Sequence, residues 1–149
     1  MFDVVDKATR SRMMSRIRGK NTQPEILIRH GLHRLGFRYR LHGSKLPGRP
    51  DIVLPKYKAV ILVHGCFWHG HDCRYFKLPS TRTGFWQGKI DGNRARDCRN
   101  TDSLLTAGWR VCIVWECAVR GRAADTEKVC NKVARWIRGK SPMAEFRGE

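Results

Sequence analysis

Acidic residues are scarce in this sequence. Only 13 Asp and Glu stand against 30 Lys and Arg among 149 residues, which gives a formal net charge of +17. Such an excess goes far beyond what solubility requires and predicts a polyanionic partner. The basic residues are spread along the whole chain, which favours a broad surface for DNA or RNA over a short cluster beside a membrane.

Long apolar runs are also missing. No stretch of the sequence approaches the roughly 20 apolar residues that a membrane-spanning helix needs. Residues 1–18 contain no apolar segment of signal-peptide length, so we expect a cytoplasmic protein. In that reducing compartment, the six cysteines are expected to be metal ligands or buried thiols rather than disulfides.

The chain contains neither an internal repeat nor a low-complexity linker, and its length suits one domain. Residues 1–20 are basic and lack a clean apolar period, so we expect an arm that contacts DNA. Residues 21–138 are expected to form a single domain, and residues 139–149 a flexible tail.

Thr22-Gln23-Pro24-Glu25 has the form of a capping box and predicts the start of a helix that ends at Gly36. Its expected apolar face consists of Leu27, Ile28, Leu32 and Leu35. The later pattern predicts strands at 37–41, 51–54 and 59–63, a long loop at 64–79, a helix at 85–107 broken near Gly88 or Gly92, a strand at 109–115 and a last helix capped by Asp125.

This order of elements predicts an α/β fold in which helices cover both faces of a central sheet. The run at 59–63 is too apolar for a half-exposed strand, so we expect a central one. Three tryptophans lie on regular patterns and are expected in the core, namely Trp109, Trp115 and Trp136.

Cysteine and histidine are concentrated in one segment, His64-Gly-Cys66-Phe-Trp-His69-Gly-His71-Asp-Cys73. Thiolates with imidazole at such density are typical of zinc sites. Together with a cysteine that follows the strand at 109–115, they predict a closed, structural zinc site made of Cys66, His71, Cys73 and Cys117. The alternative is buried thiols with surface histidines, which is the interpretation that suits Cys98, Cys112 and Cys130.

An antiparallel pairing of the strands at 51–54 and 59–63 would bring Asp51 to the end of the second strand. Asp51 follows a proline and is open to interpretation as an ordinary strand-start residue. In a chain so poor in acids, however, a carboxylate close in sequence to Lys45, Arg49 and Lys56 indicates a site for a divalent metal and a phosphate.

His64 and His69 remain once His71 is assigned to zinc, and imidazole is suited to proton transfer at neutral pH. Support of the zinc site is the alternative role for both. Glu25 also has two candidate roles, in the capping box or as a carboxylate presented to the edge of the sheet.

These residues resemble those of the very short patch repair (Vsr) endonucleases. The resemblance rests on Asp6-Lys-Ala-Thr-Arg-Ser11, Leu46-Pro-Gly-Arg-Pro-Asp51, His64-Gly-Cys-Phe-Trp-His69, Thr81-Arg-Thr, Phe85-Trp86, and Gly108-Trp-Arg-Val through Val114-Trp-Glu-Cys-Ala118. It implies a restriction-endonuclease-like fold of the PD-(D/E)xK type. It also implies an enzyme that nicks one strand of duplex DNA beside the thymine of a T:G mismatch, the product of 5-methylcytosine deamination.

The resemblance also implies roles for single residues. Magnesium would be held by Asp51 and by the main-chain carbonyl of Val63. His69 would act as general acid or base, supported by Glu25 and Asp97, although Asp97 is also open to interpretation as a solvated partner of neighbouring arginines. His64 would be a further catalytic residue, at the place where most relatives of this fold carry a lysine. The acidic member of the usual Asp/Glu-x-Lys signature is absent, because Leu62-Val63-His64 stands there.

Base-stack wedges are implied at Phe67, Trp68 and Trp86, and Met14 in the arm would add apolar contact with DNA. The polar sequence around Phe67 and Trp68 provides no apolar neighbours to bury them. A monomer is expected, with mismatch-repair proteins as candidate partners. The rival hypotheses are a zinc-containing module that binds distorted DNA without catalysis, and a site-specific restriction nuclease that cuts both strands.

Overall fold

A computed structural model describes residues 22–121 and 125–148, in which five strands form one mixed sheet in the order β1-β2-β3-β4-β5. β1, β2 and β3 are antiparallel neighbours, whereas β3, β4 and β5 run parallel. The strands are β1 (Arg40–Leu41), β2 (Ile52–Leu54), β3 (Ala59–His64), β4 (Arg110–Trp115) and β5 (Met143–Phe146). The predicted arm, including Met14, lies outside the described residues.

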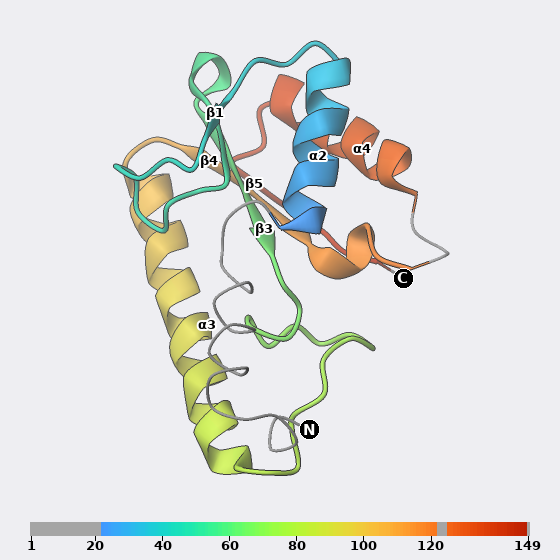
Figure 1. Cartoon of the computed structure of the whole chain (residues 1–149). Helices are drawn as coiled ribbons and strands as arrows, with labels where there is room; N and C mark the ends of the chain where they lie inside the picture. The colour runs from blue at the N-terminus through green and yellow to red at the C-terminus, as the bar shows by residue number, and fades with distance from the viewer. Residues whose placement is uncertain (1–21, 122–124, 149) are drawn as a thin grey trace.

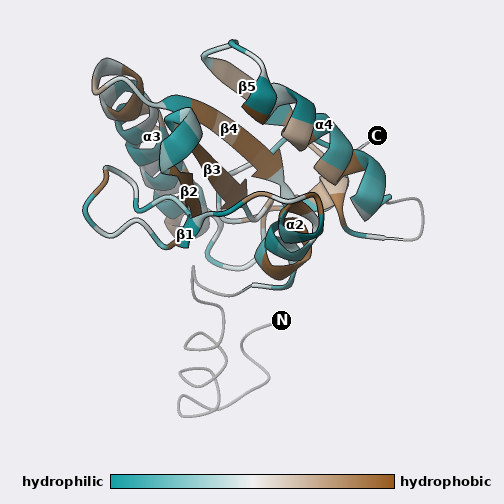
Figure 2. Cartoon of the chain, turned by 90° about the horizontal axis from the view of Figure 1, so that it is seen from above, coloured by the Kyte–Doolittle hydropathy of each residue, from teal (hydrophilic) through white to brown (hydrophobic). Residues whose placement is uncertain are grey.

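Helices cover both faces of this sheet, as the order of elements predicted. α2 (Gln23–Arg34) and α4 (Thr126–Arg138) lie on one face, and α3 (Thr83–Thr106) lies on the other (Figure 1, Figure 2). Short 3-10 helices follow β2 and β4, at Pro55–Tyr57 and Glu116–Ala118. None of the helices in the described part of the chain is long and apolar enough to cross a membrane.

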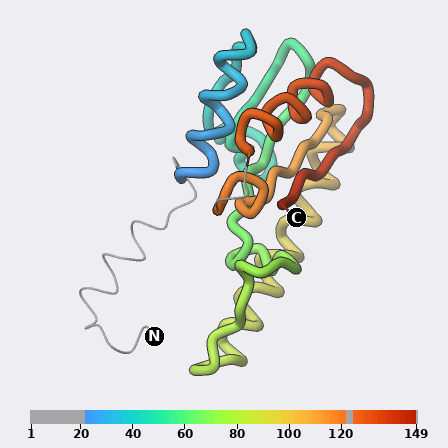
Figure 3. Tube along the Cα trace, turned by 90° about the vertical axis from the view of Figure 1, so that its right-hand side faces the viewer, coloured from blue at the N-terminus to red at the C-terminus, as the bar shows by residue number. Residues whose placement is uncertain are grey.

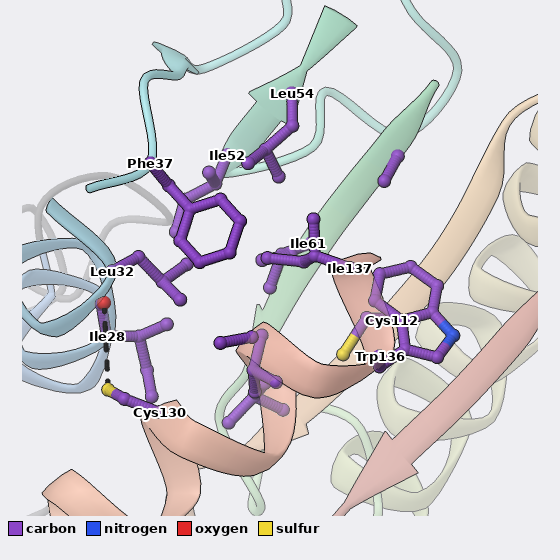
Figure 4. Close-up of a cluster of buried hydrophobic side chains, with 14 of the residues drawn as sticks. Ile28, Leu32, Phe37, Ile52, Leu54, Ile61, Cys112, Cys130, Trp136 and Ile137 are labelled. Carbon is purple, nitrogen blue, oxygen red and sulfur yellow. Dashed lines mark hydrogen bonds between the residues drawn. The ribbon is translucent and has the colours of Figure 1, made fainter. Parts of the chain in front are cut away.

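The sheet therefore separates two apolar layers. Ile61 of β3 packs among Ile28 and Leu32 of α2 and Ile137 of α4, the layer drawn in Figure 4. Its strand neighbours Val60 and Leu62 belong to the opposite layer, together with residues of α3 and β4. All of the predicted 59–63 run is buried except Val63, which is partly buried, so the expected central strand is confirmed.

α2 begins and ends where its sequence indicates. The Thr22 hydroxyl accepts a hydrogen bond from the Glu25 backbone N–H, and Gly36 ends the helix in the left-handed region, with φ of 95°. Ile28 and Leu32 are buried on its apolar face, but Leu35, expected on the same face, is 38% exposed. Leu35 is the C-cap of α2, one residue beyond the last helical residue, so it does not continue the packed stripe.

α3 is continuous, so the break predicted near Gly88 or Gly92 is wrong. Both glycines are exposed, and a helix tolerates each at a cost of only about 1 kcal/mol relative to alanine. The N-terminal half of α3 runs beyond the sheet beside the loop at 65–82 (Figure 1, Figure 3). Cys98 of α3 is exposed, in contrast to the buried thiol expected there, whereas Cys112 and Cys130 are buried as expected.

The tail predicted to be flexible contains a fifth strand, so this prediction is wrong for Met143–Phe146. β5 pairs in parallel with β4, and Ala144 and Phe146 pack against the α2/α4 layer. Because only two apolar side chains of β5 reach that layer, the sequence gives a weak indication of a strand here. Main-chain pairing with β4 is what stabilises β5. At the other edge, the strand expected at 37–41 is reduced to the two residues of β1.

Candidate active site and metal cluster

A cleft of about 670 Å³ opens where β2 begins and β3 ends, and it contains most of the predicted catalytic residues. Its walls come from the β1–β2 connection, the ends of these two strands, the loop after β3 and one face of α3. The lining residues are His42, Ser44, Gly48, Arg49, Asp51, Leu62, Val63, His64, His69, Asp97 and Asn100.

Asp51 is placed by the antiparallel pairing of β2 and β3, in which Ile52 pairs with Ile61. Asp51 Oδ2 accepts a 2.7 Å hydrogen bond from the Val63 backbone N–H, so the predicted meeting of this aspartate with the end of β3 is confirmed. Burial raises the pKa of Asp51 to about 8; the Val63 hydrogen bond opposes this rise, and the Glu25 carboxylate adds to it.

Glu25 reaches the same place from the first turn of α2 and is 1% exposed. Its backbone N–H is held by Thr22, while its side chain lies 3.1 Å from His42 Nε2 and 3.4 Å from Arg29. The buried Glu25 and the partly buried Asp51 thus form a pair of interacting carboxylates. Oxygen ligands of this kind suit a hard divalent cation, which would relieve the repulsion between them.

His64 ends β3 and lies under the cleft, almost fully buried. Its ring stacks on that of His69, with centroids 3.9 Å apart and planes within 4°. Burial, together with the neighbouring His69, lowers the pKa of His64 to about 3, which favours the neutral ring at physiological pH. Its Nδ1 atom has no hydrogen-bond partner among the described residues.

His69 lies on the loop after β3, and its Nδ1 atom forms a short hydrogen bond with Asp97 Oδ2. A carboxylate on one ring nitrogen fixes the tautomer and leaves Nε2 free to take or give a proton. Asp97 is therefore bound within the site, in contrast to the solvated ion pair that its sequence neighbours left open.

The sequence reasoning missed His42 and Asn100 as lining residues. A usable signal was present on α3, where Asn93, Asp97 and Asn100 repeat at helical spacing in a strongly basic helix. Each of the three is partly buried, and Asn93 Nδ2 donates a 2.9 Å hydrogen bond to the Trp68 carbonyl. This polar stripe faces the site.

The four predicted zinc ligands meet beside the cleft. One donor atom from each of Cys66, His71, Cys73 and Cys117 lies within 4.8 Å of the others, and we call these residues the Cys/His cluster. Burial raises the pKa of the Cys66 thiol, and the neighbouring Cys73 and Cys117 thiols raise it further. Thiols packed this closely fit a metal ion, because a bound metal holds them as thiolates and removes their mutual repulsion.

Contacts around the Cys/His cluster tie it to β4 and to the C-terminal segment. The His71 ring stacks on Trp115 at 3.9 Å, and the Glu116 carboxylate accepts a hydrogen bond from the Cys66 backbone N–H. The Gly148 backbone N–H donates to Cys117 Sγ over 3.3 Å. A side chain at position 148 would meet the Cys117 carbonyl at 2.2 Å, so only glycine approaches this closely.

Phe67, Trp68 and Trp86 form an aromatic cluster between the loop after β3 and the start of α3. Their ring centroids lie 5.1 to 5.9 Å apart. Phe67 also contacts Phe76, so the expectation that Phe67 and Trp68 lack apolar neighbours is wrong. All three rings of the cluster are only partly buried. The predicted core positions are confirmed for Trp115 and Trp136, which are buried, and Trp109 is partly buried.

Known proteins match this chain closely. The family model described as "DNA mismatch endonuclease Vsr" matches residues 2–75. The DNA mismatch endonuclease Vsr of Escherichia coli is 47% identical over 147 residues, covering 98% of this chain and 94% of the relative. The Type II nicking enzyme V.XorIIP of Xanthomonas oryzae is 50% identical over 88% of this chain and 96% of its own length.

A third relative, the Type II nicking enzyme V.NmeAIP of Neisseria meningitidis, is 42% identical over 93% of this chain and 98% of its own length. These identities extend over almost the whole chain and include the segments that build the cleft and the Cys/His cluster. The chain therefore belongs to the Vsr family of DNA mismatch endonucleases, and it is a hydrolytic enzyme that nicks DNA.

Proposed function

We propose that the enzyme nicks one strand of duplex DNA beside the thymine of a T:G mismatch, in a reaction that depends on magnesium. The observation that carries this proposal is the meeting, in one cleft, of Asp51 with the His69–Asp97 pair, where Asp51 is backed by the buried Glu25 carboxylate. The two carboxylates suit a divalent cation, and the His69–Asp97 pair suits proton transfer. Hydrolysis of a phosphodiester needs both.

The residues that would hold magnesium are Asp51 and Val63, both of which line the cleft, with Val63 acting through its main-chain carbonyl, and the buried Glu25 beside Asp51. When bound, magnesium supplies charge that stabilises the phosphate in the transition state and lowers the pKa of water. Zinc is assigned to the Cys/His cluster, where four protein donors leave no open position, so its role is structural.

His69 is the residue that moves the proton, through Nε2. Asp97 holds the opposite ring nitrogen, and the stacked, neutral His64 ring supports the face of the imidazole. His64 and Asp97 therefore act by positioning His69. A fixed orientation matters, because a general acid or base must lie within hydrogen-bond reach of the group it serves.

Mismatch recognition is assigned to the aromatic cluster. A mismatched step is easier to unstack than a matched one, so a wedge of aromatic rings responds to the deformability of the DNA. Phe67, Trp68 and Trp86 already support one another through ring contacts, which preserves their arrangement before DNA binds. Met14 of the arm is proposed to add contact from the other side.

We further propose that the mixed sheet with helices on both faces is of the restriction-endonuclease type, and that the enzyme acts as a monomer in the cytoplasm. The +17 net charge supports binding to any duplex, with recognition of the mismatch added to it. Mismatch-repair proteins are the proposed partners, since a nick starts repair and does not complete it.

A strand-resolved cleavage assay tests this function. T:G and matched duplexes, labelled on each strand in turn, are incubated with and without magnesium, using the wild type, Asp51→Asn and the exposed control Asp102→Asn. We expect the wild type and Asp102→Asn to make one nick, in the T:G duplex and only when magnesium is present. Asp51→Asn should make no nick. Binding without any nick would favour a non-catalytic module, and cleavage of both strands of the matched duplex would favour a restriction nuclease.

A further inference from the structure

Arg49 is the one Lys or Arg that lines the cleft, as far as residues 22–121 and 125–148 show. The other ionisable groups there are carboxylates and imidazoles. Lys45, four residues earlier, is exposed but does not line the cleft, and Lys56 follows the far end of β2. Among the described residues, an anionic phosphodiester that enters the cleft therefore meets one permanent positive charge.

The backbone at Arg49 is strained in a way that presents this side chain. Its φ is 45°, in the left-handed region, which non-glycine residues rarely adopt. Pro50 follows, and a residue before proline is further restricted to extended conformations. Strain of this kind persists only where the surrounding structure imposes it, and it gathers at functional sites.

The connection that carries Arg49 is held firmly at both ends. Gly43 and His42 donate backbone hydrogen bonds to the carbonyls of Pro50 and Asp51. The Arg49 backbone N–H itself donates to the Leu46 carbonyl. Contacts with the rest of the fold fix the turn, because Leu46 packs against the α3 layer and Gly48 lies against the Asn100 side chain.

The guanidinium is available for a ligand. Arg49 is exposed, and no carboxylate among the described residues pairs with it. An arginine fork presents two parallel N–H donors that match two oxygens of one phosphate. Most of the basic charge of the chain lies outside the cleft, so it contributes to general DNA binding rather than to contact with the reacting group.

We propose that the Arg49 guanidinium binds the phosphate at which the strand is nicked and stabilises its charge during hydrolysis. This assignment rests on the proposed function, because it requires the nicked phosphate to enter the cleft beside Asp51. No covalent step involves Arg49. Its contribution is a charge-assisted contact that strengthens as negative charge develops on the phosphate oxygens.

Binding to modified DNA tests this contact without relying on activity. A series of T:G duplexes carries one neutral methylphosphonate at each phosphate around the mismatched thymine, and affinity is measured without magnesium. The proteins are the wild type, Arg49→Gln and Lys45→Gln. Glutamine bears the same left-handed penalty as arginine, so the backbone strain is unchanged, and equal melting temperatures check that both variants fold.

For the wild type and for Lys45→Gln, we expect neutralisation of the nicked phosphate to weaken binding roughly tenfold. The affinity of Arg49→Gln for the unmodified duplex should be about as low as that of the wild type for the duplex with a methylphosphonate at the nicked position. The same methylphosphonate should not weaken binding of Arg49→Gln any further, which is the result expected when Arg49 and this phosphate contact each other directly. Its nicking rate should fall by roughly 10²- to 10³-fold, with partial recovery in Arg49→Lys.

Coupling of Arg49 to a different phosphate, to none, or equally to every phosphate would overturn the assignment. The proposed function fails separately, in the cleavage assay, if the wild type leaves the T:G duplex intact. In that case the nicked phosphate is undefined and the assignment falls with it. A wild type that nicks, combined with an Arg49→Gln variant that keeps the full methylphosphonate effect, overturns the role of Arg49 alone.

Discussion

Replacement of Asp51 by asparagine should stabilise the protein when no divalent cation is present. In the unfolded chain an aspartate ionises near pH 3.9, whereas burial beside Glu25 raises the pKa of Asp51 in the fold to about 8. Below pH 4 both states carry the proton and the carboxyl costs nothing. Between pH 4 and pH 8, Asp51 ionises in the unfolded state but stays protonated in the folded state. Ionisation therefore stabilises only the unfolded state, and the free energy of unfolding falls with rising pH until it levels off above pH 8.

The magnitude follows from the size of the shift. A gap of about four pH units corresponds to roughly 5 kcal/mol at 1.36 kcal/mol per unit, a large share of the stability of a domain this size. Asparagine cannot ionise, and its side-chain oxygen can still accept the hydrogen bond from the Val63 N–H. Asp51→Asn should therefore exceed the wild type in stability by several kcal/mol at pH 8, with the difference vanishing near pH 4.

Urea unfolding of both proteins between pH 4 and pH 9, in buffer stripped of divalent cations, measures this difference. Magnesium added at pH 8 should stabilise the wild type but not the variant, since a ligand that binds only the folded state raises its stability. The exposed Asp102→Asn serves as the control and should show neither effect. A difference that is constant with pH, or a variant less stable than the wild type at pH 8, would refute the reasoning.

Three further experiments test other parts of the molecule. Cys117→Ala should lose most of the bound zinc, whereas Cys130→Ala, outside the Cys/His cluster, should keep about one zinc per chain; equal metal contents would sink the zinc assignment. Trp68→Ala should reduce the preference for T:G over matched duplex by about 1–3 kcal/mol while the salt dependence of binding stays the same, and a loss of both would point to a packing role. Gly88→Ala and Gly92→Ala should each raise the free energy of unfolding by about 1 kcal/mol in thermal melts, because an added methyl group meets no atom within 4 Å, and lower stability would contradict a continuous helix.

Local patterns in the sequence were enough to place the sheet centre and the Cys/His cluster. The apolar run of β3 can be satisfied only by burial on both faces, and the antiparallel return from β2 then brings Asp51 to Val63. Cys66, His71 and Cys73 are close enough in sequence to be recognised as a ligand set. Cys117 could be added because it follows the neighbouring central strand.

Contacts that depend on the phase of a helix or on main-chain pairing could not be predicted this way. The pairing of His69 with Asp97 requires knowledge of which face α3 turns toward the loop, and the basic residues of that helix hide its apolar period. β5 depends on backbone hydrogen bonds to β4, to which its own side chains contribute little signal. The continuity of α3 through Gly88 and Gly92 similarly depends on the packing of other parts of the helix, which the local sequence does not show.

The loop after β3 contributes residues to the cleft, to the aromatic cluster and to the Cys/His cluster within eight residues. Cys66 and His71 belong to the Cys/His cluster, while His69 between them faces the cleft and Trp68 joins the aromatic cluster. No helix or strand fixes this stretch, so its shape depends on the cluster and on a few backbone hydrogen bonds, such as His71 N–H to the Cys66 carbonyl at 2.9 Å. A structural metal ion bound by Cys66 and His71 would therefore fix the backbone that carries Trp68 and His69. We expect loss of this metal to impair both proposed roles, mismatch recognition and proton transfer.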